Sequence, residues 1–511
     1  MNLDVGGRHP IERWIQVMSA AQLPVLGQTL RQISKLRADE ESVRPRDLSQ
    51  VVLHDPLMAL RVLRFLKERK SAHAMTEITT IEHAIMMLGV SPFLRTFGSL
   101  RSLDAELGSR KMALQGLIAV VARARHAALH ASEWARLRHD IESDEVVIAT
   151  LLHDMAEMLL WYFAPAQAED IETRLAADAT QRSVDVQHAV LGFSLNELQL
   201  ALATAWKLPP LITSLMDDYR AERPRARNVL LAVNLTRHSN NGWEDAALPD
   251  DIEAIGRLIG RPVLDVKQRI FHTALEAGRD HEWYGDRAPA MWLPPFPLDI
   301  EPAATIPGPR NSSSLYNRVS SLLAADSDED LINWAGSGAP SPAGPSPSLA
   351  ALVALTFHGL YKGAGLARQI FFSIDESGTL ARARYLGGVR DSIKLARHTL
   401  PIGMADSLTR RLAQDGAVWW KGSADELAVT DLAREWRAAG QGEGFFAGMI
   451  RTADGRGALL YCDANKGSML LNEERFSQFR EICDLLSIKI AGPIPEPAEP
   501  TDPVDPAEPA A

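Results

Sequence analysis

Apolar residues recur at spacings of three and four along the first 282 residues, which is the period of amphipathic helices. A clear example is the run Leu48, Val51, Val52, Leu57, Leu60 and Leu63. Asp55-Pro56 interrupts this run, and proline is best tolerated in the first turn of a helix, so a second helix is expected to begin there. Strand-type alternation is missing between about residues 21 and 282, and residues 21–285 are therefore predicted to form an all-α bundle.

The period changes after residue 348. "ARQIFFSID-ESG-TLARARYLGG" and "GFFAGMIRT-ADGR-GALLYCDAN" each have the form strand, glycine-containing turn, strand. The helical stretches "LAALVALTFHGLYKGAG" and "NEERFSQFREICDLLSIKI" precede and follow them. Residues 348–490 are therefore predicted to form an α+β domain of sensor-like plan.

The remaining segments have compositions that are poor in core-forming residues. Residues 286–347 are rich in proline, serine and small residues and are predicted to be a linker that carries one short amphipathic helix, either transient or docked. Residues 491–511 are acidic and proline-rich, which predicts a disordered tail, and residues 1–20 form an N-terminal lead. The predicted organisation is therefore multidomain.

Charge and cysteine content narrow the class of protein. The chain has 511 residues, 65 acidic and 54 basic side chains and a net charge of −11, with no block of lysine and arginine, which argues against nucleic-acid binding. Its two cysteines, Cys462 and Cys483, favour a reducing cytoplasm. No signal-peptide core and no charge-free run of membrane-spanning length occur, so no contact with a membrane is expected.

The stretch "VVIATLLHDMAEMLLWYFAP", residues 146–165, is predicted to be one buried helix with His153 and Asp154 in its middle. A buried carboxylate needs a cation, a set of donors or a metal ion. His126, His130, His188 and the pair Asp217-Asp218 lie on other predicted helices. Imidazole and carboxylate from several helices suit zinc, iron or manganese, although scattered histidines are more often core or surface residues.

Five successive segments of the helical half resemble those of the HDOD domain, the HD-related output domain of bacterial signalling proteins. They are "LPVLGQTLRQI", "LSQVVLHDPLMALRVLRFL", "ITTIEHAIMMLGVSPFLRTF", "ATLLHDMAEMLL" and "VQHAVLGFSLNELQLALATAWKLPPLI". The resemblance covers roughly residues 20–220. It implies an all-α bundle related to HD-type metal-dependent phosphohydrolases, usually without hydrolase activity.

The resemblance also suggests roles for individual residues. It makes His126, His153, Asp154 and Asp218 the candidates for a vestigial divalent-metal site. Ala156-Glu157 replaces the Gly-Lys that active enzymes favour, and Asp217-Asp218 replaces the paired histidines usual in this family. Because an acid in place of a base repels a phosphate substrate, no catalytic residue is assigned.

Residues 348–490 resemble a GAF-type sensor domain through their order of strands and helices. A small-molecule ligand is therefore expected there, with no identifiable cofactor. Cys462 and His398 are candidate cofactor ligands, although a strand cysteine is more often core filler. Arg382, Arg384 and Arg390 are candidate anion ligands, although alternating arginines usually mark the solvated face of a strand.

Three hypotheses for function remain. The first is a cytoplasmic bacterial signal-transduction protein, not an enzyme, in which a non-catalytic HDOD output domain is coupled to a GAF-like sensor; protein partners are expected and a homodimer is allowed. The second is an active metal-dependent phosphohydrolase acting on a nucleotide or cyclic dinucleotide. The third is a purely structural scaffold without a small-molecule ligand. Fold-level resemblance alone does not decide between them.

Overall fold

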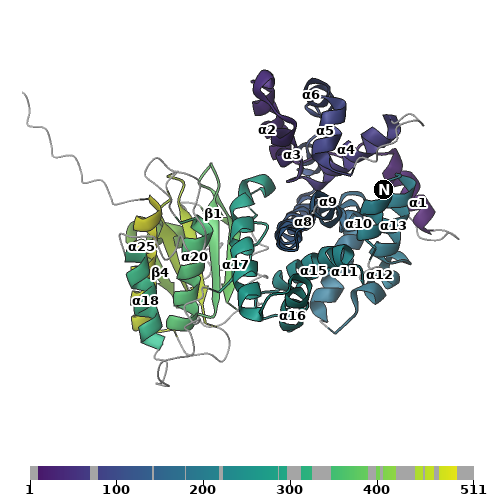
Figure 1. The fold of residues 1–511 in the computed structure, drawn as a ribbon. Helices are drawn as coiled ribbons and strands as arrows, with labels where there is room; N and C mark the ends of the chain where they lie inside the picture. Colours follow the sequence, from purple (N-terminus) through teal and green to yellow (C-terminus); the bar gives the residue numbers. More distant parts are fainter. Residues whose placement is uncertain are drawn as a thin grey trace, which may run out of the picture.

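The computed structural model describes residues 10–69, 79–140, 143–178, 180–217, 222–285, 287–295, 312–324, 347–388, 399–402, 407–421, 444–452, 455–464 and 471–491. Within them the chain forms a helical unit, residues 10–285, and a sheet unit, residues 287–491. Figure 1 shows the two units side by side, with the last long helix of the helical unit facing the sheet unit. Of the predicted site residues, Asp218, Arg390 and His398 lie outside the described residues, as does the predicted tail beyond residue 491.

The helical unit contains no strand within its described residues, as its helical period predicted. Its helices are α1 (Pro10–Ala20), α2 (Gly27–Arg37), η1 (Glu40–Ser42), α3 (Pro45–Val52), α4 (Pro56–Arg69), α5 (Ile81–Leu88), α6 (Val90–Phe97), α7 (Leu103–Leu107), α8 (Lys111–Leu137), α9 (Ser143–Leu152), α10 (Met155–Phe163), α11 (Pro165–Ala177), α12 (Ser183–Leu191), α13 (Leu195–Ala205), α14 (Pro210–Leu215), α15 (Pro224–Ser239), α16 (Leu248–Ile259), α17 (Val263–Arg279) and η3 (Asp280–Tyr284). The helix expected to begin at Pro56 does so. Residues 10–20 of the predicted lead form α1, whose Trp14 and Met18 are buried in the helical core.

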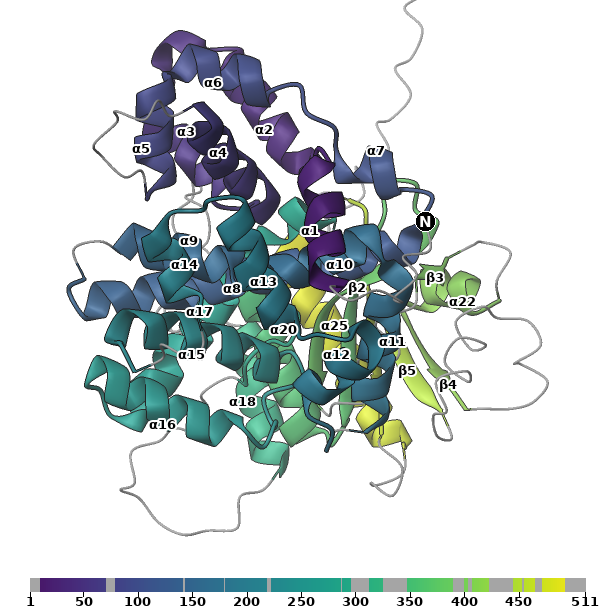
Figure 2. The same cartoon turned by 90° about the vertical axis from the view of Figure 1, so that its right-hand side faces the viewer.

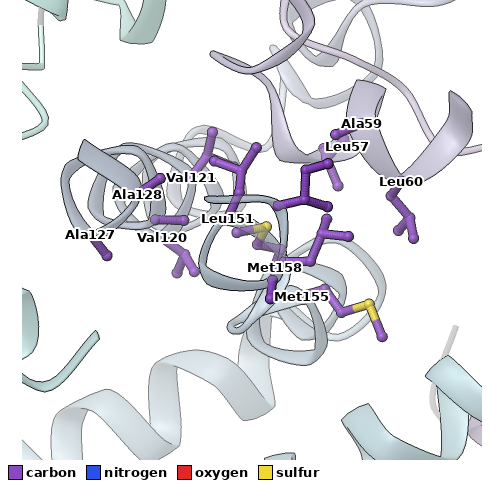
Figure 3. Packing of buried hydrophobic residues seen from close by; sticks show 14 of the residues in the cluster. Leu57, Ala59, Leu60, Val120, Val121, Ala127, Ala128, Leu151, Met155 and Met158 are labelled. Atoms are coloured by element: carbon purple, nitrogen blue, oxygen red, sulfur yellow. The ribbon is translucent and has the colours of Figure 1, made fainter. Parts of the chain in front are cut away.

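The centre of the helical unit is α8, a 27-residue helix against which α9, α10, α15 and α17 pack. Figure 3 shows the apolar contacts between α4, α8, α9 and α10, among them Leu57, Val121, Leu151 and Met155. In Figure 2 the helices α2 to α6 form a lobe of their own above α8 and α9. The polar residues that interrupt this core therefore lie among closely packed helices.

The predicted single helix over residues 146–165 is wrong. α9 ends at Leu152 and α10 begins at Met155, so His153 and Asp154 form the turn between two helices. The segment Ser143–Phe163 is nevertheless apolar and long enough to cross a membrane by length and composition, and 83% of its most apolar window is buried inside the protein. Such burial is what a core element of a globular bundle shows.

The sheet unit contains a six-stranded antiparallel sheet in the order β3-β2-β1-β6-β5-β4. The strands are β1 (Arg368–Ile374), β2 (Leu380–Gly388), β3 (Leu400–Pro401), β4 (Ala417–Trp420), β5 (Phe445–Ile450) and β6 (Ala458–Asp463). Both predicted hairpins are confirmed, because β1 pairs with β2 and β5 with β6. The predicted flanking helices are α20 (Leu349–His358), which continues as the π-helix η5 (Gly359–Gly363), and α25 (Glu473–Ala491).

Each face of the sheet is covered. The helices α18 (Ser312–Ala324), α20 and α25 pack on one face, where Cys462 is buried as core filler. The short helix α22 (Ser407–Asp415), together with Met291 and Trp292, packs on the other face. A sheet with two apolar faces is thus buried between layers.

Residues 286–347 are not simply a linker. Within them α18 buries Tyr316, Val319 and Leu323 in the core of the sheet unit. The segment before it joins the sheet, since Leu293 N donates to Leu386 O at 3.2 Å and Leu386 N donates to Met291 O at 2.8 Å. The described parts of this region therefore belong to the sheet unit.

Candidate functional site

Asp154 is buried at the turn between α9 and α10, and two arginines hold its carboxylate. Arg237 Nη2 donates to Oδ1 at 2.5 Å, and Arg123 Nη2 donates to Oδ2 at 2.9 Å. His153 Nδ1 lies 3.2 Å from Oδ1. The Asp154 side chain is only 4% exposed. Both of its oxygens are therefore already engaged by protein cations.

Arg123 also holds the second acid of the site. Its Nη2 donates to Oε2 of Glu157 at 2.6 Å. Glu157 lies in the first turn of α10, four residues after His153. The sequence interpretation gave Glu157 the role of repelling a phosphate, whereas in the structure this carboxylate is paired. Arg123, Arg237, Asp154 and Glu157 together form a charge-balanced cluster, which we call the arginine–carboxylate cluster.

The cluster strongly favours ionised Asp154. Burial alone would raise the pKa of Asp154, but Arg237 and Arg123, followed by His153, hold it well below its ordinary value. Burial would likewise lower the pKa of Arg123, and Glu157 and Asp154 reverse that effect and raise it. The buried charges are thus mutually compensated, as a buried ion pair requires.

His126 finds its partner on its own helix. Its Nε2 lies 3.0 Å from Nε2 of His130, four residues further along α8, and both rings are buried. Burial lowers the pKa of His126 to about 3, and burial together with His126 lowers that of His130 well below its ordinary value. The two imidazoles are therefore neutral core residues at neutral pH.

The structure brings some of the predicted metal ligands into contact and holds others apart. His153 touches Asp154, His126 pairs with His130, and Asp218 lies outside the described residues. His188 is exposed on α12, 3.5 Å from Glu197. Among the residues described, no three histidine, cysteine, aspartate or glutamate side chains are grouped as a metal ion requires. This donor arrangement does not fit a metal ion, because guanidinium groups already occupy the central carboxylate.

The cluster faces a cleft of about 1310 Å³ that lies between the two units. Helices α8, α10 and α15 supply one side, with Arg123, Glu157 and Arg237. The other side includes Trp292 and Arg382, the latter exposed on β2. The predicted anion ligand Arg384 is instead half-buried, and its Nη2 lies 2.7 Å from Nδ1 of His281 at the contact between the units. The cleft is thus a feature of the two-unit assembly.

The sequence reading missed both arginines. Arg123 could have been found, because it precedes His126 by three residues and this spacing places two residues on the same side of a helix. Arg237 carries no such signal, because it lies 83 residues after Asp154 on a helix outside the five recognised segments.

Comparison with protein families matches residues 23–221 to the HDOD domain. Residues 23–221 are an HDOD domain. It is followed by the helical extension, with α15 to α17, and by the antiparallel sheet. Arg123, His153, Asp154 and Glu157 lie within the HDOD domain, whereas Arg237 comes from the extension. The extension therefore completes the charge pairing of the domain's central carboxylate.

Three solved structures are similar to parts of the chain. The MmoQ response regulator from Methylococcus capsulatus is 20% identical, covers 49% of this chain and 98% of its own, and has a TM-score of 0.37. A virulence factor from Campylobacter jejuni is 16% identical, with coverages of 52% and 97% and a TM-score of 0.39. An HDOD domain protein with unknown function from Geobacter sulfurreducens is 18% identical, with coverages of 53% and 96% and a TM-score of 0.30. A comparison with curated proteins gave no match.

Proposed function

We propose that this chain is a cytoplasmic signal-transduction protein in which a non-catalytic HDOD domain acts as the output and the sheet unit acts as a sensor of GAF type. The observation that carries the proposal is the pairing of Asp154 with both Arg123 and Arg237. In this role the output surface binds protein partners. The chain acts as a monomer or as a homodimer.

The charge balance of the site supports the absence of catalysis. A hydrolytic metal ion needs carboxylate and imidazole ligands and an open coordination position for water. Here such an ion would have to displace two guanidinium groups from a carboxylate that is 4% exposed. Because the two arginines already balance Asp154 and Glu157, the site has no uncompensated negative charge left to attract a cation.

The contact between the units supports coupling between sensor and output. Tyr385 on β2 donates its hydroxyl hydrogen to the carbonyl oxygen of Gly278 on α17 at 2.9 Å, and both residues are buried. Leu275 of α17 belongs to the apolar core of the sheet unit. We therefore expect a rearrangement at β2 to change the packing of α17, the last long helix of the helical unit, because coupling between sites is carried by packed elements.

A hydrolysis assay tests the proposal. Purified full-length protein, supplied with Mn²⁺, is assayed on a phosphodiester such as a cyclic dinucleotide and on a nucleoside triphosphate. We expect turnover no greater than that of the His153→Ala variant. His188→Ala is the matched control, because His188 is exposed and outside the cluster. Metal-dependent turnover that disappears in His153→Ala and persists in His188→Ala would contradict the proposal and favour the phosphohydrolase alternative.

A further inference from the structure

The short helix η3 contacts one residue of the HDOD domain from three directions. That residue is His54, in the turn between α3 and α4. The Asp280 carboxylate lies 3.4 Å from His54 Nε2, and the Trp283 ring stacks on the imidazole with centroids 4.2 Å apart at 12°. The Tyr284 hydroxyl donates to the His54 carbonyl oxygen at 2.8 Å. η3 therefore holds the ring edge, the ring face and the backbone of a single residue.

Arg125 joins this contact to the central helix α8. Its Nε donates to the Asp280 carboxylate at 3.1 Å, and its Nη2 lies 3.2 Å from His54 Nε2. The side chains of Arg125 and Asp280 are only 15% and 23% exposed. Removing one partner of an ion pair that is mostly shielded from water is costly. Asp280 therefore fastens η3 to α8 and to the α3–α4 turn together.

Strand β2 of the sheet unit holds η3 from its other side. Arg384 Nη2 donates to Nδ1 of His281, the residue after Asp280, at 2.7 Å. Burial and Arg384 lower the pKa of His281 to about 4, so its ring is neutral at neutral pH and accepts this bond. Tyr385 donates to the carbonyl oxygen of Gly278, two residues before Asp280. β2 thus contacts the chain on both sides of Asp280.

The α3–α4 turn lies in the lobe that α2 to α6 form (Figure 2). The contacts of this lobe with the rest of the helical unit include α4 on α8 and α9, and α2 on η3. Asp55, the residue after His54, accepts from Leu26 N at the start of α2 and from Leu57 N in α4. A displacement of His54 would therefore shift Asp55 and, with it, the starts of both helices.

We propose that η3 is a latch through which β2 of the sheet unit sets the position of the α2–α6 lobe on α8. Residues 280–284 lie beyond residues 23–221 of the HDOD domain, so the lobe is held by a segment that the domain itself does not supply. Coupling needs a continuous set of packed and bonded elements, and β2, η3 and the α3–α4 turn form one. The inference rests on the proposed coupling of sensor to output and names the element that carries it. It does not depend on whether the site at Asp154 is catalytic.

Amide hydrogen exchange of the full-length protein, followed by mass spectrometry, tests the latch. Asp280→Asn should speed exchange in α3 and α4 about tenfold, because it removes a hydrogen bond between charged groups. Arg384→Gln should speed exchange in the same two helices, although its hydrogen bond goes to η3 and not to the lobe. The double variant should exceed the faster single variant only slightly, because both changes open the same latch. Unchanged exchange in β1 and β6 separates release of the lobe from loss of global stability.

Asp265→Asn is the matched control. Asp265 lies in the first turn of α17, is paired with Arg269 and has a side chain that is 31% exposed. Its replacement should leave exchange in α3 and α4 as in the wild type. Trp283→Leu keeps every charge, removes the stacked ring and should act as Asp280→Asn does.

Three results would overturn the latch. They are wild-type exchange of α3 and α4 in Asp280→Asn, Trp283→Leu or Arg384→Gln, an equal rise in Asp265→Asn, and a rise confined to β2 and η3 in Arg384→Gln. None of them bears on the hydrolysis assay, so the latch and the non-catalytic role fail separately.

Discussion

Two guanidinium groups meet one buried carboxylate at Asp154, and this contact decides how the His-Asp pair is interpreted. Removing the carboxylate leaves Arg123, whose side chain is mostly buried, with Glu157 as its remaining acidic partner, whereas Arg237 is exposed enough to regain water. We therefore expect Asp154→Asn to lower the free energy of unfolding by about 3 kcal/mol, the lower end of the range for breaking a buried ion pair. Urea denaturation measures this.

The control for this substitution is an exposed ion pair. Glu253 and Arg257 are more than half exposed on α16, so Glu253→Gln should cost less than about 1 kcal/mol. Equal effects of Asp154→Asn and Glu253→Gln would mean that the cluster contributes nothing beyond a surface pair.

The His126–His130 pair predicts how stability depends on pH. In the unfolded chain each histidine takes up a proton below about pH 6.5, whereas burial lowers the folded-state pKa of His126 to about 3 and that of His130 well below its usual value. The unfolded state thus binds more protons between these values, so stability falls as pH falls below about 6.5.

Replacing one imidazole isolates its share of this dependence. His130→Phe keeps a ring of similar size and should reduce the pH slope by up to about 1.4 kcal/mol per pH unit between pH 6 and pH 4. Chemical denaturation at several pH values gives both slopes. Identical slopes for wild type and His130→Phe would show that His130 takes up no extra proton on unfolding.

The chemistry of single residues was only partly predictable from sequence. His153 and Asp154 stood out as polar residues in an apolar stretch. For Cys462 the sequence left a cofactor ligand and a core residue as alternatives, and in the structure Cys462 is buried in the core of the sheet unit. Arg237 could not be predicted as a partner, because only the tertiary fold brings α15 beside the turn at Asp154.

At the scale of elements, Asp55 joins two helices of the HDOD domain. Its Oδ2 accepts from Leu26 N at 2.8 Å and Thr29 Oγ1 at 2.9 Å, at the start of α2. Its Oδ1 accepts from Leu57 N at 3.0 Å and Met58 N at 3.1 Å, in the first turn of α4. One buried carboxylate therefore caps α4 and fastens α2 to it.

We expect Asp55→Ala to lower the free energy of unfolding by about 3 kcal/mol or more, because it leaves four buried donors without their acceptor. Asp39→Ala is the control, since Asp39 is exposed and, among the described residues, its side chain accepts from Ser42 alone. Thermal unfolding followed by circular dichroism compares the two. The capping account would be wrong if both substitutions shifted the midpoint equally.

Elements with a strong local period were predictable, but the break at His153-Asp154 was not. Both hairpins and the helix beginning at Pro56 follow from local pattern and turn chemistry. The break at His153 escaped prediction because an apolar run has the same appearance in one helix as in two. α18 was foreseen as an amphipathic piece, but its docking depends on Tyr316 and Val319 meeting glycines of η5, which no local signal specifies.

At the scale of the whole molecule, the two units pack against each other through a buried contact, and a flexible linker is not their only connection. Tyr385 bonds to Gly278, and Trp243 of the helical unit donates from Nε1 to the carbonyl oxygen of Trp292 at 2.9 Å. The sequence could not predict this contact, since residues 286–347 have the composition of a linker and their pairing with β2 depends on non-local geometry.

The shared contact predicts linked protection of β2 and α17. Tyr385→Phe removes one buried hydrogen bond, worth about 1 kcal/mol, and leaves the Gly278 carbonyl without it. Amide hydrogen exchange should rise in β2 and α17 together. Tyr361→Phe is the comparison, because Tyr361 also bonds across the two units, to Glu244, but at an exposed position, and it should raise exchange less than Tyr385→Phe does. Faster exchange in β2 alone would show that the units are energetically independent.

We infer that Arg123 and Arg237 take the place of a metal ion at the His-Asp pair. Calorimetric titration of Mn²⁺ into the metal-free, full-length protein tests it most directly, with the Asp154→Ala variant titrated in parallel. The account predicts the same weak or undetectable heat for both proteins. Stoichiometric binding of Mn²⁺ to the wild type that is lost in Asp154→Ala would contradict it.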